Sequence, residues 1–368
     1  MMNLDRFYSR PDRTGLLDLA EQETDSYGTV DLARAAELDI TRDTYLEAQS
    51  QGLTLSELLE SDEYDPSPLN SPLDAFERQL AVNGIRVSGR NSSPVDLFYK
   101  NAPALLPEFI LREVNRGMKM KPELSRLVAG TTVIAGTRYT PFYIDTSDND
   151  KFSLRPVGEG AEIPGLTVTE QKHSVTLQDY GLSLKTSYRT LRHRSTAQFK
   201  VLLWYIGYQL QADKIGLVVD TIVNGDGNDN AAGVISSDAS GTIDYGDLVK
   251  LWAEFAPFEM NHLICHITTL KTILGLDEFK DPLAGYRFRR TGELFTPLGA
   301  TLVRSDEVAA DRVIGLDNRF AVEEVISQPL MVEFDKIIEQ KFEEAVISET
   351  VAYAKVVKEA AVILDYNY

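Results

Sequence analysis

The feature that most limits how this chain can fold is one long helical pattern at residues 195–223. Apolar side chains recur there at intervals of three and four, which is the repeat of a helix with a buried face. Ser195 or Thr196 can cap its start, and Gly225 lies just past its end. At 1.5 Å per residue the helix would be about 40 Å long. Because a typical globular helix is shorter, we expect this one to link two lobes.

Strand-like segments precede this helix. Residues 131–145 are rich in β-branched and aromatic side chains, which strands favour. Residues 166–178 and 180–188 alternate in polarity, and they predict a long two-stranded hairpin with its return near Asp179. An isolated hairpin of this length is only marginally stable in water. It therefore needs a partner surface, either in the same chain or in a neighbour.

Short helices and strands follow the long helix, without a regular βαβ repeat. Helices are predicted at 246–256 and 268–275. Apolar or alternating runs predict strands at 262–267, 297–305, 312–316, 319–334 and 336–366. This mixture indicates the α+β fold class.

The first 130 residues have a different character. Helices are predicted at 29–38, 54–60 and 103–117, the last ended by Gly117. Thr54 with Glu57 three residues later is a capping-box pattern. These helices are short and are separated by polar and proline-rich stretches. We therefore expect an arm without a large core of its own, packed along other surfaces.

Charge is distributed unevenly along the chain. The formal net charge is −19, so the whole protein would repel a phosphate backbone on average. Residues 1–66 hold 16 Asp or Glu, five Arg and no Lys. Residues 180–212 contain no acidic residue and five cationic ones, which are Lys185, Arg189, Arg192, Arg194 and Lys200. Such asymmetry indicates segments with different neighbours.

The helices at 29–38 and 54–60 could be read as a helix-turn-helix. A recognition helix needs Arg, Lys, Asn or Gln directed at phosphates and bases. Residues 43–66 instead contain seven carboxylates and no basic residue. A soluble DNA-binding regulator is therefore the weaker hypothesis.

Other signals concern location. No apolar run is long enough to span a bilayer, and the polar start of the chain, with both charge signs, does not resemble a secretory signal. The single cysteine, Cys265, cannot form an internal disulfide, which agrees with a reducing compartment. We expect a cytoplasmic origin and no membrane association.

Two local patterns resemble metal sites only in part. Residues 226–230 (DGNDN) alternate oxygen ligands as a calcium loop does, but Ala231 replaces its glycine and Ser237 its bidentate glutamate. His262, Cys265 and His266 are close in sequence, although on a strand Cys265 and His266 would face opposite sides. We expect no metal at either place.

No enzyme motif was found. The chain has no G-x-S-x-G nucleophile elbow, no Walker lysine and only four histidines. We therefore predict no catalytic residue, no cofactor and a protein that is not an enzyme, with an uncatalogued hydrolase as the remaining alternative.

Several strings occur in the order found in the major capsid proteins of tailed bacteriophages, which have the Hong Kong 97 fold. The string PVGEGAEIP resembles the start of their extended loop, and VNGDGNDNAAGVIS resembles the turn that ends their spine helix. The similar segments are 156–164, 174–195, 223–236, 297–306 and 312–322. The resemblance covers about residues 130–368.

The resemblance implies a Hong Kong 97-like capsid fold with five parts. These are an N-terminal arm, an extended β-hairpin loop, a long spine helix, an axial domain and a peripheral domain. Their expected bounds are 1–130 for the arm, 150–190 for the loop, 195–223 for the spine helix, 246–324 for the axial domain, and 131–149, 191–245 and 325–368 for the peripheral domain.

The resemblance also implies a function. The chain would self-assemble through hexamers and pentamers into the icosahedral head shell of a virion, assembled in the host bacterial cytoplasm. The shell would enclose double-stranded DNA without sequence-specific binding, with a portal and scaffolding or decoration proteins as further partners. The expected contacts of the loop with neighbouring subunits are Arg155, Glu159, Glu162, Lys172, Lys185, Arg189, Arg192 and Arg194.

Some alternatives remain open within this family. An encapsulin-like bacterial nanocompartment has the same fold and would enclose enzymes, although the acidic arm and the chain length favour a virus. The basic stretch 185–200 could face a neighbouring subunit, DNA or solvent. Some relatives form Lys–Asn crosslinks, for which Lys172 and Asn318 are the candidates. Many relatives lose an N-terminal scaffolding segment, which we expect to be retained here because the chain begins at Met1.

Overall fold

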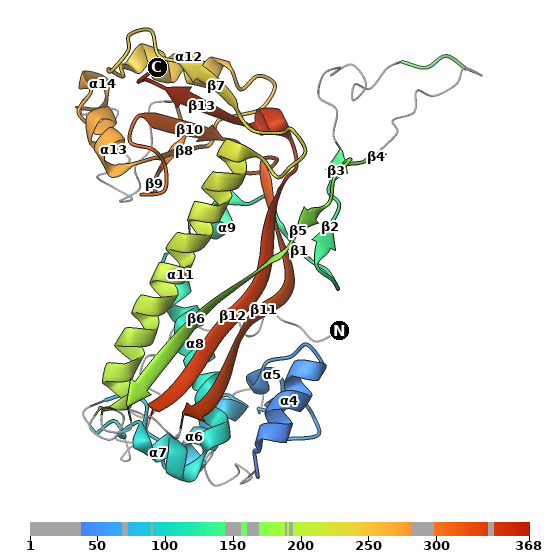
Figure 1. The fold of residues 1–368 in the computed structure, drawn as a ribbon, viewed down its shortest axis with the longest axis vertical. Helices are drawn as coiled ribbons and strands as arrows, with labels where there is room; N and C mark the ends of the chain where they lie inside the picture. Colours follow the sequence, from blue (N-terminus) through green and yellow to red (C-terminus); the bar gives the residue numbers. More distant parts are fainter. Residues whose placement is uncertain are drawn as a thin grey trace. The chain divides into compact units, whose positions relative to one another are not determined.

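The computed structural model describes residues 38–67, 73–89, 91–121, 123–143, 156–159, 169–187, 190, 194–280, 298–337 and 342–368 (Figure 1). Helices and strands are both abundant, which confirms the α+β class. The chain divides into two compact units. The first comprises Met1–Lys119, Gly181–Tyr208 and Leu330–Ser348, and the second comprises Met120–Tyr180, Gln209–Pro329 and Glu349–Tyr368.

Short helices build most of the first unit. They are α4 (Arg42–Ser50), α5 (Leu55–Leu59), α6 (Ala75–Val82), α7 (Asp96–Asn101), the 3₁₀ turn η1 (Pro103–Leu105) and α8 (Leu106–Lys119). The capping box predicted for α5 is confirmed: the amide of Glu57 donates to Thr54 Oγ1 at 3.2 Å, and the amide of Thr54 donates to Glu57 Oε2 at 2.8 Å. The helix predicted at 29–38 lies outside the described residues, apart from its last residue.

These helices enclose a core, so the prediction of an arm without a large core is wrong. Leu55, Phe76, Phe98, Phe109 and Val114 are at most 2% exposed. The rings of Phe98 and Phe109 pack with their centroids 5.0 Å apart. Helix α8 supplies many of the buried residues, and the shorter helices α4 to α7 supply fewer each. The core is therefore spread over separate short segments, and it was not recognised from the sequence.

The long helix is confirmed. It is α11 (Thr196–Asn224), within one residue of its predicted ends. Within the first unit its backbone touches that of α8: a Cβ added to Gly207 would lie 2.0 Å from the carbonyl oxygen of Val114, and one added to Gly117 would lie 2.3 Å from that of Trp204. Gly117 thus allows two helices to approach closely. It does not end α8, as predicted, because that helix continues to Lys119.

A four-stranded sheet has the strand order β1-β11-β12-β6. Strand β1 (Thr131–Val133) pairs in parallel with the first residues of β11, from Glu324 to Ile326. The other strands are long, and the boundary between the units falls within each of them: β11 (Val322–Ile337), β12 (Phe342–Lys355) and β6 (Gln178–Ser187). The strands predicted at 319–334 and in the first part of 336–366 are confirmed.

The predicted hairpin between 166–178 and 180–188 is wrong. Residues of the first run pair instead with the preceding segment and form a ribbon of two short antiparallel pieces: β2 (Arg138–Tyr139) with β5 (Val175–Thr176), and β3 (Phe142–Tyr143) with β4 (Thr169–Glu170). The second run is β6, which neighbours β12. Alternating polarity identifies a strand and its two faces, but it does not identify the partner strand.

A five-stranded sheet of order β7-β13-β10-β8-β9 organises the second unit. Its alternate residues face two cores, since Ile264, Ile314 and Ile363 belong to one buried cluster and Leu263, Val313 and Val362 to the other. The strands are β7 (Gly233–Ser236), β8 (His262–Cys265), β9 (Thr301–Arg304), β10 (Arg312–Leu316) and β13 (Ala361–Asp365).

Helices cover this sheet. Val218 and Ile222 of α11 lie in the cluster of Ile264, and Leu248 and Ile273 lie in the cluster of Leu263. The predicted helices at 246–256 and 268–275 are confirmed as α12 and α13. The bounds of the remaining helices are α9 (Leu124–Leu127), α12 (Tyr245–Ala253), α13 (Ile267–Leu274), α14 (Asp277–Lys280) and the 3₁₀ turn η4 (Lys358–Ala360).

Candidate functional site

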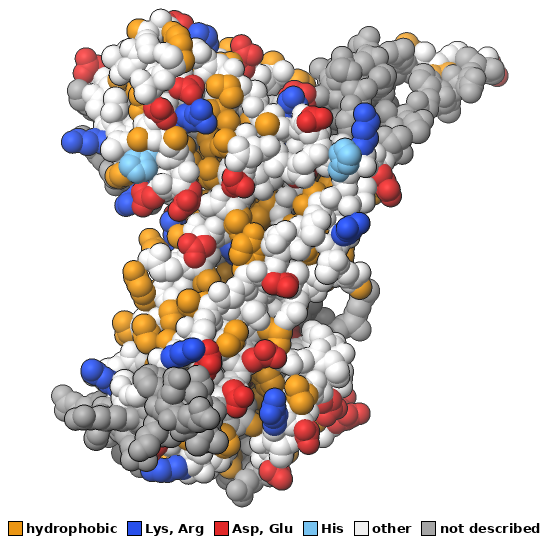
Figure 2. Space-filling model, viewed as in Figure 1, with side chains coloured by type: hydrophobic (Ala, Val, Ile, Leu, Met, Phe, Trp, Pro, Cys, Tyr) orange, Lys and Arg blue, Asp and Glu red, His pale blue; other side chains and the backbone are white. Residues whose placement is uncertain are grey.

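One face of α11 in the first unit carries large apolar side chains that are exposed. Val201, Leu202, Tyr205 and Tyr208 are 59%, 43%, 61% and 40% exposed. Their spacing of one, three and three residues places them on one side of the helix. We call these four residues the α11 stripe. Figure 2 shows hydrophobic side chains at the surface over this part of α11.

The helical segment that carries the stripe exposes no charged side chain of its own. Between Ser195 and Ala212 the only charged residue is Lys200, and this side chain is 6% exposed. Its ammonium lies 3.5 Å from Glu113 Oε1 and donates to Ser88 Oγ at 2.9 Å. Trp204 Nε1 donates to Glu113 Oε2 at 2.6 Å. Burial lowers the pKa of the Lys200 ammonium, although the charge of Glu113 opposes the shift.

The second unit also buries a charged residue of α11, which is Lys214. Its ammonium lies 2.9 Å from Glu349 Oε2 and 3.2 Å from Glu324 Oε1, and Tyr353 also donates to Glu324, at 3.2 Å. Burial alone would lower the pKa of Lys214, but the two carboxylates outweigh it and raise that pKa. Burial raises the pKa of the Glu349 carboxyl. The four side chains form what we call the Lys214 cluster.

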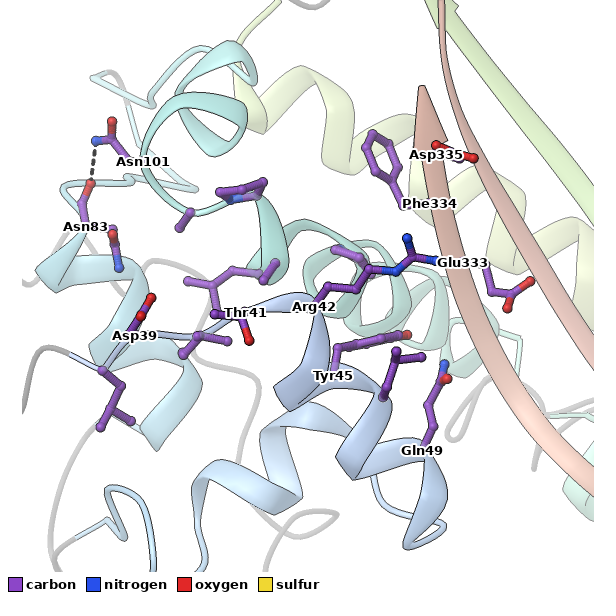
Figure 3. Close-up of a pocket in the computed structure, with 18 of the residues that line it drawn as sticks. Asp39, Thr41, Arg42, Tyr45, Gln49, Asn83, Asn101, Glu333, Phe334 and Asp335 are labelled. Atoms are coloured by element: carbon purple, nitrogen blue, oxygen red, sulfur yellow. Dashed lines mark hydrogen bonds between the residues drawn. The ribbon is translucent and has the colours of Figure 1, made fainter. Parts of the chain in front are cut away.

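A hollow of about 1180 Å³ lies in the first unit, between α4, the residues before α8 and the ends of β11 and β12 (Figure 3). Tyr45 in its wall donates to the carbonyl oxygen of Val332 at 2.7 Å, and burial is the main cause that raises the pKa of Tyr45 to about 12. Four carboxylates and one arginine contribute to the lining: Asp39, Glu333, Asp335, Glu344 and Arg42. The lining of this hollow mixes apolar and charged residues, and no hydrogen bond among the described lining residues joins a nucleophile to a base.

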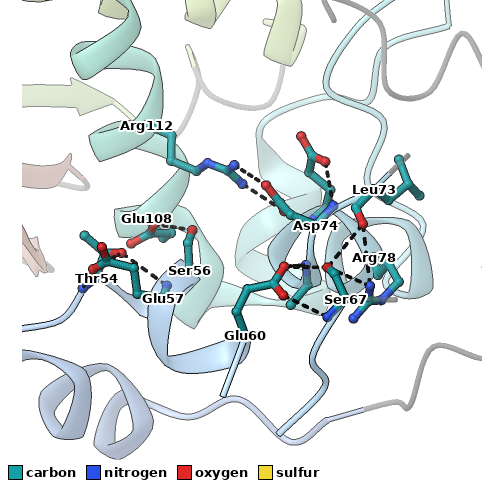
Figure 4. Close-up of polar contacts among 12 residues, drawn as sticks. Thr54, Ser56, Glu57, Glu60, Ser67, Leu73, Asp74, Arg78, Glu108 and Arg112 are labelled. Carbon is teal, nitrogen blue, oxygen red and sulfur yellow. Dashed lines mark hydrogen bonds and ion pairs between the residues drawn. The ribbon is translucent and has the colours of Figure 1, made fainter. Parts of the chain in front are cut away.

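Polar contacts hold α5, α6 and α8 together (Figure 4). Arg112 pairs with Asp74, the capping residue of α6, and Ser56 donates to the buried carboxylate of Glu108. Burial raises the pKa of the Glu108 carboxyl. Four of the five residues of α5 are buried in this arrangement. Helix α5 therefore cannot lie in a DNA groove as a recognition helix would, which argues against the helix-turn-helix hypothesis.

The His262, Cys265 and His266 side chains have separate environments. His262 Nδ1 is 2.8 Å from Asn261 Oδ1, whereas His266 accepts a hydrogen bond from the amide of Thr268 as the cap of α13. Burial raises the pKa of the Cys265 thiol to about 12. Across the described part of the chain, no group of three or more His, Cys, Asp or Glu residues is arranged to hold a metal ion.

The residues predicted to contact neighbouring subunits have varied positions. Lys185 on β6 lies 3.4 Å from Glu344 of the same chain. Glu159, Lys172 and Arg194 are exposed. The other four lie outside the described residues: Arg155, Glu162, Arg189 and Arg192. The structure thus pairs Lys185 internally, and contact with another subunit stays a prediction for all eight.

The two crosslink candidates also differ. Asn318 Nδ2 donates to the carbonyl oxygen of Arg126 at 2.7 Å, and its Oδ1 accepts from Asn261 at 2.7 Å. Lys172 is exposed. A crosslink between copies of the chain stays a prediction.

Neither the α11 stripe nor the Lys214 cluster was predicted from the sequence. The apolar repeat of this helix indicates a single buried face, and it predicts neither an exposed apolar stripe nor a buried lysine. The signal that could have found the stripe is the absence of charge on residues 201–212, which leaves every face of that helical segment able to meet protein.

No protein-family model matches this chain, and no curated protein matches it. Among the described helices, none is both long and apolar enough to cross a bilayer.

Solved structures with a similar arrangement exist. The virus-like particle of Pyrococcus furiosus matches with a TM-score of 0.47 and 15% identity, over 71% of this chain and 97% of its own. The encapsulin complex of Synechococcus elongatus matches with a TM-score of 0.46 and 14% identity, over 67% of this chain and 88% of its own. The capsid of an empty GTA particle matches with a TM-score of 0.48 and 14% identity, over 67% of this chain and 90% of its own. The chain is similar to these capsid and encapsulin structures at low sequence identity.

Proposed function

We propose that this chain is the major capsid protein of a tailed bacteriophage. It would self-assemble into an icosahedral head shell that encloses double-stranded DNA. The observation that carries the proposal is the α11 stripe, an exposed and uncharged face on an otherwise strongly acidic protein. The ordered strings of residues 130–368 that resemble those of capsid proteins give it further support.

The stripe suits a second copy of the same chain. Each copy has a formal net charge of −19, so two copies repel each other at long range. Contact through a face without charge buries apolar area at about 25 cal/mol per Å² and brings no like charges together. Clustered exposed apolar side chains commonly mark protein interfaces. Closed symmetric assembly of identical chains would cover this face in every subunit.

The ribbon is proposed to be the base of the extended loop. Its pairs, β2 with β5 and β3 with β4, have two residues in each strand. Such short pairings are marginal in isolation and gain stability from a surface laid against them. Phe142 in this ribbon is 61% exposed. The loop of one subunit would cover a neighbour, with the eight charged residues predicted to contact neighbouring subunits at the edge of the contact.

We also propose the five-part division into arm, loop, spine helix, axial domain and peripheral domain, with the bounds given above. The role is structural, without a catalytic residue or cofactor. An acidic shell encloses DNA without adhering to it, because its charge opposes binding of phosphates. A portal and scaffolding or decoration proteins are the further partners, and the virion formed in the host cytoplasm is the location.

Electron microscopy of the purified full-length chain tests this proposal. We expect closed shells or rings of subunits tens of nanometres across. DNA inside native particles would support the virus, whereas enclosed enzymes would support a compartment of the encapsulin type. A chain that stays monomeric at high salt, under crowding and with a scaffolding partner would contradict the proposal.

A further inference from the structure

The side chain of Asn228 pairs with both backbone groups of one residue in the ribbon. Asn228 Oδ1 accepts a hydrogen bond from the amide of His173 at 2.9 Å, and Asn228 Nδ2 donates to the carbonyl oxygen of His173 at 3.1 Å. Both residues belong to the second unit. This pair of bonds is what a neighbouring strand would supply to His173.

His173 occupies a break in the ribbon. Strand β4 ends at Glu170 and β5 begins at Val175, so His173 lies between the two paired pieces. Across the break, the amide of Gln171 donates to the carbonyl oxygen of Pro141 at 2.9 Å. With two residues in each paired strand, the ribbon has little resistance of its own to bending here. The Asn228 bonds attach this break to the loop between α11 and β7.

The loop that carries Asn228 is itself held in one shape. Asp226 Oδ1 accepts from the backbone amide and Nδ2 of Asn228 at 3.2 and 3.0 Å. Asp226 Oδ2 accepts from the amide of Lys355 on β12 at 2.9 Å, and Asn230 Oδ1 accepts from the amide of Asp226 at 3.1 Å. These bonds use the oxygens that a calcium loop would need for its ion.

The loop backbone restricts its shape further. Gly225 and Gly227 have φ values of +81° and +96°, and Asp229 has +56°. Such left-handed conformations favour glycine, and a non-glycine residue adopts them mainly where its surroundings require it. A Cβ added to Gly225 would lie 2.9 Å from Asn230 Oδ1. Asn228 is therefore presented to His173 from a rigid support.

We propose that Asn228 is a positioning residue that fixes the direction in which the outer part of the ribbon leaves the second unit. This inference rests on the proposed function, in which the loop beyond the ribbon covers a neighbouring subunit. A fixed direction lets the loop reach one neighbour in the same way in every subunit, which a regular shell requires. Without the two bonds, the break between the paired pieces acts as a hinge.

The test compares two variants that remove one surface asparagine each. Asn228→Ala removes both bonds to His173. Asn224→Ala is the matched control, since Asn224 Nδ2 donates only to Asp220 Oδ1, at 2.6 Å, on the exposed side of α11. Amide hydrogen exchange of unassembled full-length chain, followed by mass spectrometry of peptides covering residues 169–176, reports the bonds directly.

We expect about tenfold faster exchange in these peptides for Asn228→Ala, with unchanged exchange in β8 and β10. Asn224→Ala should exchange like the wild type. If Asn228→Ala fails to fold, Asn228→Asp keeps the side-chain size, loses the donor to His173 and places its carboxylate against that of Asp226, so it should also give faster exchange. Unchanged exchange in residues 169–176 would show that Asn228 does not hold the ribbon in place, and it would overturn the proposal.

Electron microscopy of assembled particles then tests the consequence. Asn228→Ala should yield irregular particles or open sheets, while Asn224→Ala yields regular ones. Regular particles from Asn228→Ala, despite faster exchange, would overturn the role in assembly. Failure of the wild-type chain to assemble would instead count against the proposed function. The exchange experiment tests the role of Asn228 separately, because it uses the unassembled chain.

Discussion

The two units bury the same kind of residue from the same helix, and they compensate its charge in different ways. In the first unit Lys200 has one carboxylate, Glu113, within 3.5 Å, and burial lowers the pKa of the ammonium. In the second unit Lys214 has two, Glu324 and Glu349, and its pKa is raised. The charge of Arg116 lowers the pKa of Lys200 further, so the balance of all nearby charges decides whether burial or pairing dominates.

The largest expected effect concerns the close approach of helices, which distinguishes the first unit from the second. Gly207→Ala places a Cβ 2.0 Å from the carbonyl oxygen of Val114, so α8 and α11 must separate. We expect a loss of about 5 kcal/mol or more in the free energy of unfolding, measured in urea, because only backbone can move to make room.

Gly216→Ala is the matched control in the second unit. The added Cβ would meet only the flexible side chain of Glu307, at 2.8 Å, and Glu307 is exposed and can move away. Alanine also favours the helix over glycine by about 1 kcal/mol. This variant should be neutral or slightly more stable than the wild type. Equal losses from the two variants would contradict the assigned helix contact.

The second effect compares the loss of unfolding free energy when each of the two buried lysines is replaced. Lys214→Met leaves two buried carboxylates, Glu324 and Glu349, without their ammonium, and we expect a loss of about 3–5 kcal/mol in unfolding free energy at pH 7. Lys200→Met should cost about 1–2 kcal/mol, because Glu113 keeps its bond from Trp204 and its ion pair with Arg116 at 3.3 Å. Urea unfolding of both variants measures the difference. A larger loss from Lys200→Met would contradict the conclusion that Lys214 compensates more buried charge than Lys200 does.

The third effect is on pH dependence. The pKa of Glu349 is raised in the folded chain, so the folded state holds this proton more tightly than the unfolded state does. The resulting stability is complete below the unfolded pKa of about 4.3 and is lost as the pH rises through the folded value. Glu349→Gln removes this titration. The stability of the variant relative to the wild type should therefore rise as the pH increases above the unfolded pKa of about 4.3.

Urea midpoints at a series of pH values measure this change. Gly216→Ala serves as the control, because it adds and removes no titrating group, and its difference from the wild type should stay constant. A difference for Glu349→Gln that is flat, or that falls as the pH rises, would show that Glu349 does not titrate as the Lys214 cluster implies.

The smallest effect is expected at the surface. Lys185 is 54% exposed and pairs with Glu344 at 3.4 Å on the edge strand β6. Exposed ion pairs of this kind contribute little, so Lys185→Ala should change the unfolding free energy of the unassembled chain by less than about 0.5 kcal/mol. Thermal unfolding measures this. A much larger loss would mean that β6 depends on the pair for its position.

Much of the fold could be predicted from local patterns. The long helix was predicted to within one residue, because its hydrophobic repeat, its N-terminal capping residues and the glycine beyond its end agree. The bounds of β10 were predicted correctly, and Thr54 and Glu57 gave the start of α5. These features depend on neighbouring residues in the sequence.

The errors concern contacts between distant residues. No pattern within residues 166–188 indicates that β5 pairs with β2 or that β6 lies beside β12. Gly117 has the sequence signature of a helix end, and only the crossing with Trp204 explains it. The basic residue Lys200 was expected to meet a neighbour, DNA or solvent, but it points to Glu113. The α11 stripe likewise required knowledge of which helical face remains uncovered.

The most direct test of the central claim is analytical ultracentrifugation of Tyr205→Glu, which puts a charge in the α11 stripe. Thr272→Glu adds the same charge at an exposed position of α13 and serves as the control. We expect the wild type and Thr272→Glu to sediment as large particles, whereas Tyr205→Glu should stay folded by circular dichroism and sediment as small species. Particles of normal size from Tyr205→Glu would contradict the claim that this face joins copies of the chain.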